Sequence, residues 1–274
     1  MSPTDSKPTA VPSLPSRPGI PSRAAIWRAP LPHLADRPGT RLLCRTVLSL
    51  FHGHVRSIQG LEHVTTGSEP FLLVLNHSQR PEAILVPAWL CFHRGGRMVH
   101  FMADWNFLMI PGVSGVIRAH DPIIVMRKAA KPAFLNRLKP RFAPPLVPFD
   151  EAAKRLREGR SVGVFPEGTT NRHPTELLRG YQGAARLAVE TGVRVVPGGI
   201  RFAQTGGQRP IRDRDPFSVQ FGPDLRPPPS CNSSETASEL TKKFHDEIMT
   251  AISTLSGKRW QAHARKTKYA FDED

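Results

Sequence analysis

The sequence predicts an α/β fold in which a mixed, largely parallel sheet is flanked by helices and follows an amphipathic N-terminal helix. Short apolar runs alternate along the chain with stretches of helical periodicity, and this alternation is typical of a sheet with crossover helices. Strands are expected at 71–75, 97–102, 123–126, 161–165, 193–200 and 217–221. Helices are expected at 82–92, 150–158, 180–191 and 234–256.

The amphipathic helix is expected in the segment RLLCRTVLSLFHGHV, which begins at Arg41. Apolar residues recur at helical spacing from Leu42 to Phe51, and Arg41 and Arg45 stand at the edges of the apolar stripe. A helix of this kind packs on the core of the protein or lies on a membrane surface, and the sequence leaves both interpretations open.

Changes in composition divide the chain into three regions. Residues 1–38 contain nine of the 28 prolines, and because such a segment cannot bury a core we expect a disordered, Pro-rich arm. Residues 39–256 are expected to form one domain that carries the sheet. Residues 257–274 form a basic tail, which either lies on anionic lipid with Trp260 and Tyr269 at the interface or is solvated.

The charge of the chain restricts its partners. The 274 residues include 38 Lys+Arg against 23 Asp+Glu, which gives a net charge of +15. Such a surface attracts anionic membranes, phosphorylated small molecules or nucleic acid. We expect no nucleic-acid partner, because aromatic residues make up only 7% of the chain and are not interleaved with the arginines.

Cysteine use and hydropathy indicate where the protein works. The three cysteines lie far apart, so we expect no disulfide framework and no metal site, and a reducing compartment. No stretch approaches 18 consecutive apolar residues, and the N-terminus lacks the pattern of a secretory signal. The expectation is a peripheral protein on the cytoplasmic side of a membrane.

The apolar run FLLVL ends at Asn76 and His77, and Glu82 follows shortly afterwards. Residues five apart on a regular helix are separated by about 140°, so His77 and Glu82 can meet only if the histidine lies in the turn before a helix. Pro81 favours a helix start at that point. A histidine beside a carboxylate is the arrangement of a general base held in one tautomer, although it also occurs as a structural hydrogen bond.

Two further segments carry groups that bind anions. In GVFPEGTTNRHP, a loop containing Glu167, Gly168 and Thr169 follows a strand, with Arg179 downstream, and exposed amides with arginines predict an anion site. The strand 123–126 brings Arg127 to its end, where ligands commonly bind in α/β sheets. An ordinary strand-to-helix loop and a solvated strand end are the alternatives.

In this order, the segments resemble the glycerolipid acyltransferase family, which includes 1-acyl-sn-glycerol-3-phosphate acyltransferases. NHSQRPE is similar to the family block of Asn-His, four residues and Asp, with Glu82 in place of the aspartate. FPEGT reproduces a second block, and Glu167 stands 90 residues after His77. PGVSGVIRAHDPIIVMR, LLRGYQGAARLA and VRVVPGGI resemble the other blocks, with Met126 where an aspartate is usual. The resemblance covers about residues 55–202.

This resemblance implies an acyl-thioester-dependent O-acyltransferase of phospholipid biosynthesis. The donor would be acyl-CoA or acyl carrier protein, the acceptor a lysophospholipid such as lysophosphatidate, and the enzyme would need no cofactor or metal. His77 would be the general base and Glu82 its partner, without a covalent acyl-enzyme. The substrate-binding residues implied are Arg127, Glu167, Gly168, Thr169 and Arg179, with both arginines on the phosphate of the acceptor.

Two other interpretations stay open. The same fold and chemistry could serve a different acceptor, such as glycerol 3-phosphate or another lipid alcohol. Alternatively, the net charge of +15 and the two basic termini could belong to a membrane-binding protein without catalytic activity.

Overall fold

The computed structural model describes residues 17–265 except 66, 68, 131, 204–208 and 230–235. The strands are β1 (Val55–Gln59), β2 (Leu72–Leu75), β3 (His100–Asp104), β4 (Ile123–Val125), β5 (Val162–Val164), β6 (Val195–Phe202) and β7 (Phe217–Phe221). The α-helices are α1 (Arg23–Arg28), α2 (Pro38–Leu50), α3 (Glu82–His93), α4 (Val113–Ala119), α5 (Pro148–Arg157), α6 (Gly183–Thr191) and α7 (Ala237–Ser256). Short 3-10 helices are η1 (Pro32–Leu34), η2 (Leu61–His63), η3 (Trp105–Met109) and η4 (Ala133–Phe142).

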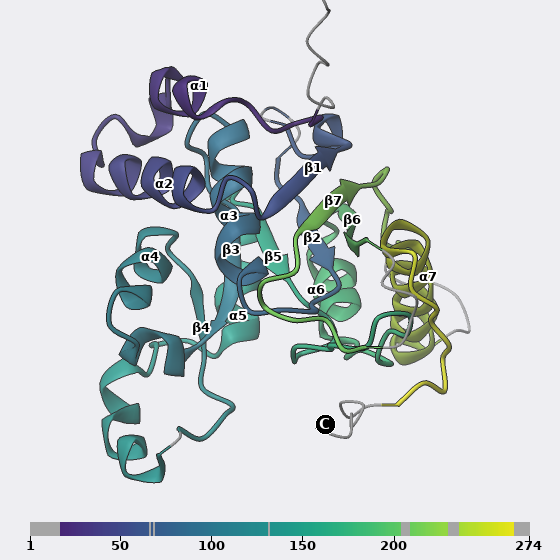
Figure 1. Cartoon of the computed structure of the whole chain (residues 1–274). Helices are drawn as coiled ribbons and strands as arrows, with labels where there is room; N and C mark the ends of the chain where they lie inside the picture. The colour runs from purple at the N-terminus through teal and green to yellow at the C-terminus, as the bar shows by residue number, and fades with distance from the viewer. Residues whose placement is uncertain are drawn as a thin grey trace, which may run out of the picture.

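The strands form one sheet in the order β1-β7-β6-β2-β5-β3-β4 (Figure 1). Neighbouring strands pair in parallel except β6 and β7, which are antiparallel. Strands β1 and β7 therefore run against the other five. The predicted α/β fold with a mixed, mostly parallel sheet is confirmed.

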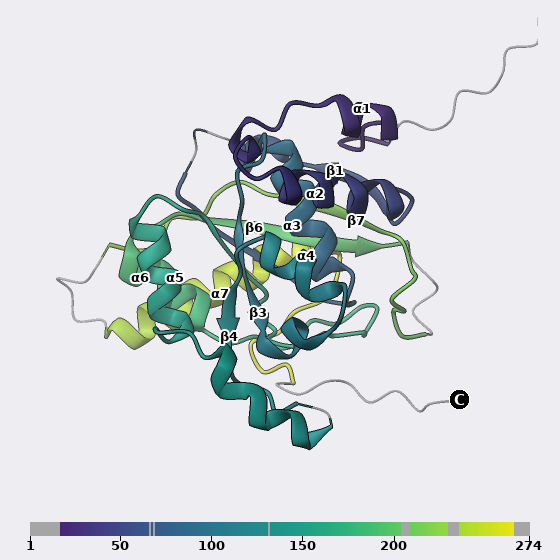
Figure 2. The same ribbon diagram turned by 90° about the vertical axis from the view of Figure 1, so that its left-hand side faces the viewer.

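Helices cover both faces of this sheet. Successive residues of a strand point to opposite faces, and all four residues of β2 are buried, as in a central parallel strand. Leu73 and Leu75 belong to the core cluster shared with α2 and α3. Leu72 and Val74 belong to the cluster shared with α5, α6 and α7. Figures 1 and 2 show these two helical layers on opposite sides of the strands.

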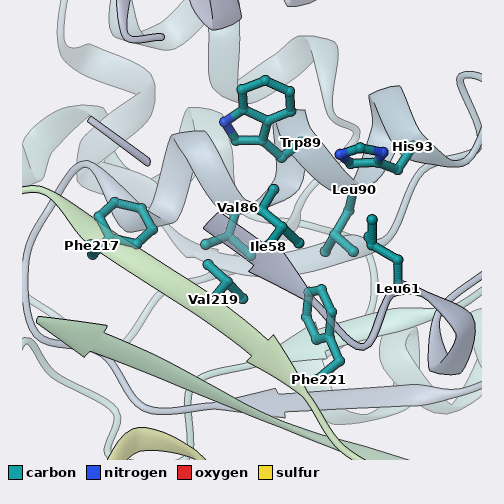
Figure 3. Close-up of a pocket in the computed structure, with 9 residues that line it drawn as sticks. All are labelled: Ile58, Leu61, Val86, Trp89, Leu90, His93, Phe217, Val219 and Phe221. Carbon is teal, nitrogen blue, oxygen red and sulfur yellow. The ribbon is translucent and has the colours of Figure 1, made fainter. Parts of the chain in front are cut away.

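Helix α3 is fixed firmly on the sheet. Figure 3 shows Val86 and Leu90 of this helix beside Ile58 of β1 and Val219 of β7. A cavity between these elements has a volume of about 10 Å³, which is room for at most one water. The residues around this cavity are Ile58, Leu61, Val86, Trp89, Leu90, His93, Phe217, Val219 and Phe221. Because the helix is locked in this way, the position of its first residue, Glu82, is fixed as well.

Residues 17–38 differ from the disordered arm expected for 1–38. They form α1 and η1, and Ile26, Leu31 and Leu34 are buried in the core shared with α2 and α3. The side chain of Ser22 caps α1. A few apolar residues between the prolines thus bury enough surface to fix this segment. Residues 1–16 of the expected arm lie outside the described residues.

The amphipathic helix is α2, and its buried face packs on the core. Cys44, Val47 and Leu48 are buried, whereas Leu42 and Leu50 are 56% and 73% exposed. Strand β1 and the elements α4 and η4 were not expected from the sequence. Among the helices that the structure describes, none is both long and apolar enough to cross a membrane.

The first part of the C-terminal tail packs on the protein. The Trp260 indole Nε1 donates a hydrogen bond to the carbonyl oxygen of Arg179 at 3.2 Å, and its ring meets the edge of His245. The sequence left Trp260 at a lipid interface or in solvent, and the structure places its ring against His245 of α7. Tyr269 lies outside the described residues.

Candidate active site

The candidate site lies where the chain leaves two neighbouring parallel strands. β2 and β5 pair directly, so the turns that follow them meet at the same edge of the sheet. The side chain of Asn76 prolongs the pairing with β6, because its Nδ2 donates to the carbonyl oxygen of Ile200 (3.1 Å) and its Oδ1 accepts from the Ile200 amide (2.7 Å). The turn that starts at His77 is thereby anchored to the rigid sheet.

His77 and Glu82 meet as the sequence predicted. Helix α3 begins at Glu82, as expected. Pro81 is its N-cap, one position before the first helical position where the proline was expected. The His77 Nδ1 atom lies 2.9 Å from Oε2 of Glu82, and the Ser78 amide donates to the same oxygen at 2.8 Å. The longer glutamate side chain therefore reaches the imidazole from the first turn of α3. Because the Nδ1 proton is directed at a carboxylate, Nε2 is left as the basic nitrogen.

The Nε2 side of His77 faces a loop that carries hydroxyl groups. The hydroxyl oxygen of Thr170 lies 3.2 Å from Nε2. The ring of Phe165 stacks on the imidazole with a centroid distance of 4.5 Å and an interplanar angle of 25°. Glu82, Thr170 and Phe165 together determine the orientation of the ring, and Nε2 can exchange its hydroxyl partner for a substrate hydroxyl.

Glu167 holds the two turns together. Its carboxylate is buried, its Oε1 accepts from the His77 amide (3.1 Å), and its Oε2 accepts from Asn171 Nδ2 (2.7 Å) and the Leu178 amide (2.9 Å). Burial raises the pKa of this carboxyl, while the Lys258 cation and the hydrogen bonds oppose the rise. Both oxygens of the side chain are used to shape the site, which is the structural role open to Glu167 beside a contact with substrate.

Gly168 and Thr169 follow in the same turn. Gly168 has φ +65, and a Cβ at this position would lie 2.8 Å from the ring of Tyr181, so both the backbone conformation and the space require glycine. Thr169 lines the cavity beside His77. Both residues line this cavity, so the structure brings them to the histidine.

A cavity of about 240 Å³ opens beside His77 and is lined mostly by apolar side chains. Its polar lining comes from His77, Asp104, His120, Arg127, Lys128, Thr169 and Thr170. Its other lining residues are Ala83, Ile84, Pro87, Phe101, Met102, Ala103, Phe107, Val116, Ile117, Pro122, Val125, Val164, Phe165 and Gly168. An apolar cavity with a basic mouth suits a molecule that has a hydrocarbon part and an anionic part.

The two arginines expected to share one phosphate line different cavities. Arg127 lines the cavity of His77, and its guanidinium lies 4.6 Å from the centroid of the Tyr181 ring and donates to the hydroxyl of that residue at 2.7 Å. Arg179 lines a neighbouring cavity of about 320 Å³, together with Glu167, Tyr181 and His245. The structure thus brings Arg127 to the histidine and does not bring Arg179 there.

Sequence reasoning missed two residues of the site. Thr170 stands directly after the Phe-Pro-Glu-Gly-Thr block, so its closeness to His77 could have been inferred from that block. Lys258, whose ammonium group donates to the Ser78 hydroxyl at 2.6 Å, is 180 residues away along the chain and carries no local signal. Within the described ranges, no group of three or more His, Cys, Asp or Glu side chains could hold a metal ion.

Known proteins are similar to this chain in sequence and in fold. Residues 55–201 match the protein family described as Acyltransferase. Over 97 residues the chain is 33% identical to a 1-acyl-sn-glycerol-3-phosphate acyltransferase of Borreliella burgdorferi; this stretch is 35% of the chain and 33% of that relative, so only a third of the relative's length is matched.

Among solved structures, the 1-acyl-sn-glycerophosphate (LPA) acyltransferase PlsC from Thermotoga maritima is similar in fold. The superposition has a TM-score of 0.52 with 19% sequence identity, and it covers 87% of this chain and 88% of that one. At this level of identity the likeness establishes the fold alone.

Proposed function

This chain belongs to the acyltransferase family, and we propose on that basis that it transfers a fatty acyl group from an acyl thioester to the hydroxyl of a lysophospholipid of the lysophosphatidate type. The observation that carries the proposal is the 2.9 Å contact between His77 Nδ1 and Glu82 Oε2, with Nε2 left basic at an apolar cavity. The similarity to a 1-acyl-sn-glycerol-3-phosphate acyltransferase supports the choice of acceptor.

In the proposed reaction His77 acts as the general base. Nε2 takes the proton of the acceptor hydroxyl as its oxygen bonds to the carbonyl carbon of the thioester. The carbon–sulfur bond then breaks, and the leaving thiolate takes the proton back from the imidazolium. Glu82 holds the ring in the required tautomer and stabilises the cation that forms during the transfer.

The cavity offers a place for each part of the substrates. Its apolar wall suits an acyl chain, and Arg127 and Lys128 at its edge suit the phosphate of the acceptor. The Thr170 hydroxyl lies beside Nε2, so the acceptor hydroxyl takes over a position that already accommodates a hydroxyl group. The donor is an acyl thioester, carried on coenzyme A or on acyl carrier protein.

The protein would work as a peripheral protein on the cytoplasmic face of an anionic membrane. Residues 127–147, which we term the basic lobe, contain six Lys or Arg and no Asp or Glu. Phe134 and Val147 of this lobe are 68% and 59% exposed. Figure 2 shows the segment after β4 projecting from the body of the molecule. Exposed apolar side chains among cations are typical of a surface that binds anionic lipid.

The proposal is tested by incubating the purified chain with acyl-CoA or acyl carrier protein thioesters and a panel of acceptors. Thiol release and the acylated product are measured together, and transfer to lysophosphatidate is expected. His77→Ala should abolish the transfer, whereas His263→Ala, a change at an exposed histidine, should not. Turnover that persists in His77→Ala would overturn the proposed chemistry.

The same panel decides between acceptors. Met126 and the single arginine at the cavity leave a different acceptor open, so glycerol 3-phosphate and a neutral lipid alcohol are included. Preference for one of these would keep the chemistry and change the substrate. Vesicle binding without any thiol release would instead favour a membrane-binding protein without catalytic activity.

A further inference from the structure

We propose that Lys258, which follows α7 and lies outside the family match, is a positioning residue of the active site: its ammonium group fixes the turn of His77 and balances the two buried carboxylates that hold it. The inference rests on the proposed function, since it concerns the same histidine. It assigns a role in that site to the C-terminal segment of the chain.

The ammonium group of Lys258 lies behind the histidine turn. It donates to the hydroxyl of Ser78 at 2.6 Å and to the carbonyl oxygen of His173 at 2.7 Å, and the side chain is only 3% exposed. The Ser78 amide donates to Glu82 at 2.8 Å. Lys258 is therefore connected through one residue to the carboxylate that orients His77.

The backbone around Lys258 is built to hold it there. Gly257, with φ +72, ends α7 in the left-handed conformation and redirects the chain towards the sheet edge. The Arg259 amide then donates to the carbonyl of Thr175 at 2.7 Å, and the Leu177 amide donates to the carbonyl of Arg259 at 2.8 Å. The segment after α7 thus pairs with the loop that follows Glu167.

Charge explains why a cation is needed at this position. Glu82 and Glu167 are both buried, at 0% and 1% exposure, and they hold the consecutive amides of Ser78 and His77. Two buried carboxylates without a cation cannot both stay ionised at low cost. With Lys258 the three groups carry a net charge of −1. When His77 takes a proton, the cluster becomes neutral, so its charge complements the state formed during transfer.

Lys258 and His173 are titratable groups at this cluster. Burial lowers the pKa of Lys258, and Glu167 and Glu82 oppose that shift. Burial lowers the pKa of His173, and the cations of Lys258 and Arg259 lower it further against the opposing effect of Glu176.

Glu82 also interacts electrostatically with His54. Burial lowers the pKa of His54, while Gln79, Glu82, Asp215 and Asp213 oppose this effect. Lys258 is a cation that interacts with both Glu82 and Glu167, since both carboxylates oppose the lowering of its pKa.

The test uses two neutral variants, Lys258→Met and Lys258→Gln, together with Lys258→Arg, which keeps the charge. Without the Lys258 cation, a proton on the His77 imidazole is what balances the two carboxylates, so the protonated ring is favoured in both neutral variants. The acid limb of kcat/KM against pH should move up by about 1 unit in both neutral variants. On the acid limb the activity at a given pH should fall about tenfold, and it should recover at alkaline pH, whereas Lys258→Arg should keep the limb of the native protein.

Lys242→Met is the matched control, because Lys242 is exposed on α7. NMR titration of the His77 ring without substrate gives a second readout, with the resonance identified by its loss in His77→Ala. A kcat/KM profile of Lys258→Gln with the same pH dependence as that of the native protein, together with an unchanged NMR titration curve of the His77 ring, would overturn the inference. Absence of acyl transfer in the native protein would overturn the proposed function instead, and the NMR titration would still decide the role of Lys258.

Discussion

The hydroxyl of Thr170 lies 3.2 Å from Nε2 of His77, the ring nitrogen that does not contact Glu82. Two different loops, one after β2 and one after β5, thus supply the base and a hydroxyl partner for it. This hydroxyl satisfies the basic nitrogen. In the proposed reaction the acceptor hydroxyl must take its position.

Replacing Thr170 with valine should lower KM for the acceptor. The variant keeps the shape of the side chain and removes the hydroxyl, so the acceptor no longer displaces a hydrogen bond worth about 1 kcal/mol. We expect KM for the acceptor to fall about fivefold while kcat stays within about threefold. Steady-state kinetics with a fixed thioester donor provide the measurement, and Thr170→Ser is the control. A large loss of kcat in the valine variant would show that Thr170 takes part in the chemistry.

Glu82 should tolerate neither amidation nor shortening. In Glu82→Gln the carboxylate no longer stabilises the imidazolium, and kcat should fall by about 100-fold or more. In Glu82→Asp the carboxylate recedes by about 1.5 Å if α3 stays in place, which should also cost on the order of 100-fold. The second result is informative because α3 is locked against β1 and β7 (Figure 3).

Thiol release at saturating donor and acceptor measures both variants, with Glu62→Gln, a change at a 75% exposed side chain, as the control. Full activity of Glu82→Asp would mean that α3 moves to restore the contact, contrary to its packing.

The histidine turn was predictable from the sequence because its determinants are local. An apolar run that ends at Asn76 marks a buried strand, and Pro81 marks the helix start. The geometry of a turn followed by a helix then left one way for Glu82 to reach His77. The mixed sheet was predictable for the same reason, since β2, β5 and β6 are short apolar runs.

Features that depend on tertiary contacts were not predictable. Lys258 reaches Ser78 only because Gly257 turns the chain after α7, and no local pattern reports this. The separation of Arg179 from Arg127 depends on where the Tyr181 side chain lies. Strand β1 is an edge strand with polar residues, so its sequence lacks the apolar run that identified the central strands.

Arg127 should recognise the phosphate of the acceptor, and Arg179 should matter less. A charge-assisted hydrogen bond is worth about 1.5–3 kcal/mol, so Arg127→Ala should raise KM for a phosphate-bearing acceptor about tenfold to 100-fold. Arg179→Ala should change it by less than about threefold, because Arg179 lines the neighbouring cavity. The KM of a neutral lipid alcohol, measured in parallel, should not change in either variant. Equal effects of the two arginines would indicate that the phosphate spans both cavities.

The basic lobe should control binding to anionic membranes. Each Lys or Arg near an anionic surface contributes about 1 kcal/mol, so Arg137→Gln/Arg141→Gln should weaken binding to vesicles that contain phosphatidylglycerol by about tenfold or more. Both side chains are exposed. The control is Arg157→Gln/Arg226→Gln, which removes the same charge from side chains that are 59% and 82% exposed elsewhere.

Phe134→Ser should reduce the binding further, because this side chain is 68% exposed in the middle of the lobe and can insert among the lipids. Co-sedimentation with anionic and with neutral vesicles at two salt concentrations separates the charge effect from the apolar effect. Acyl transfer between water-soluble short-chain substrates should stay unchanged in the lobe variants, since these positions lie outside the cavity lining. Equal losses in the lobe and control variants would mean that binding follows net charge alone and that the lobe does not orient the cavity towards the membrane.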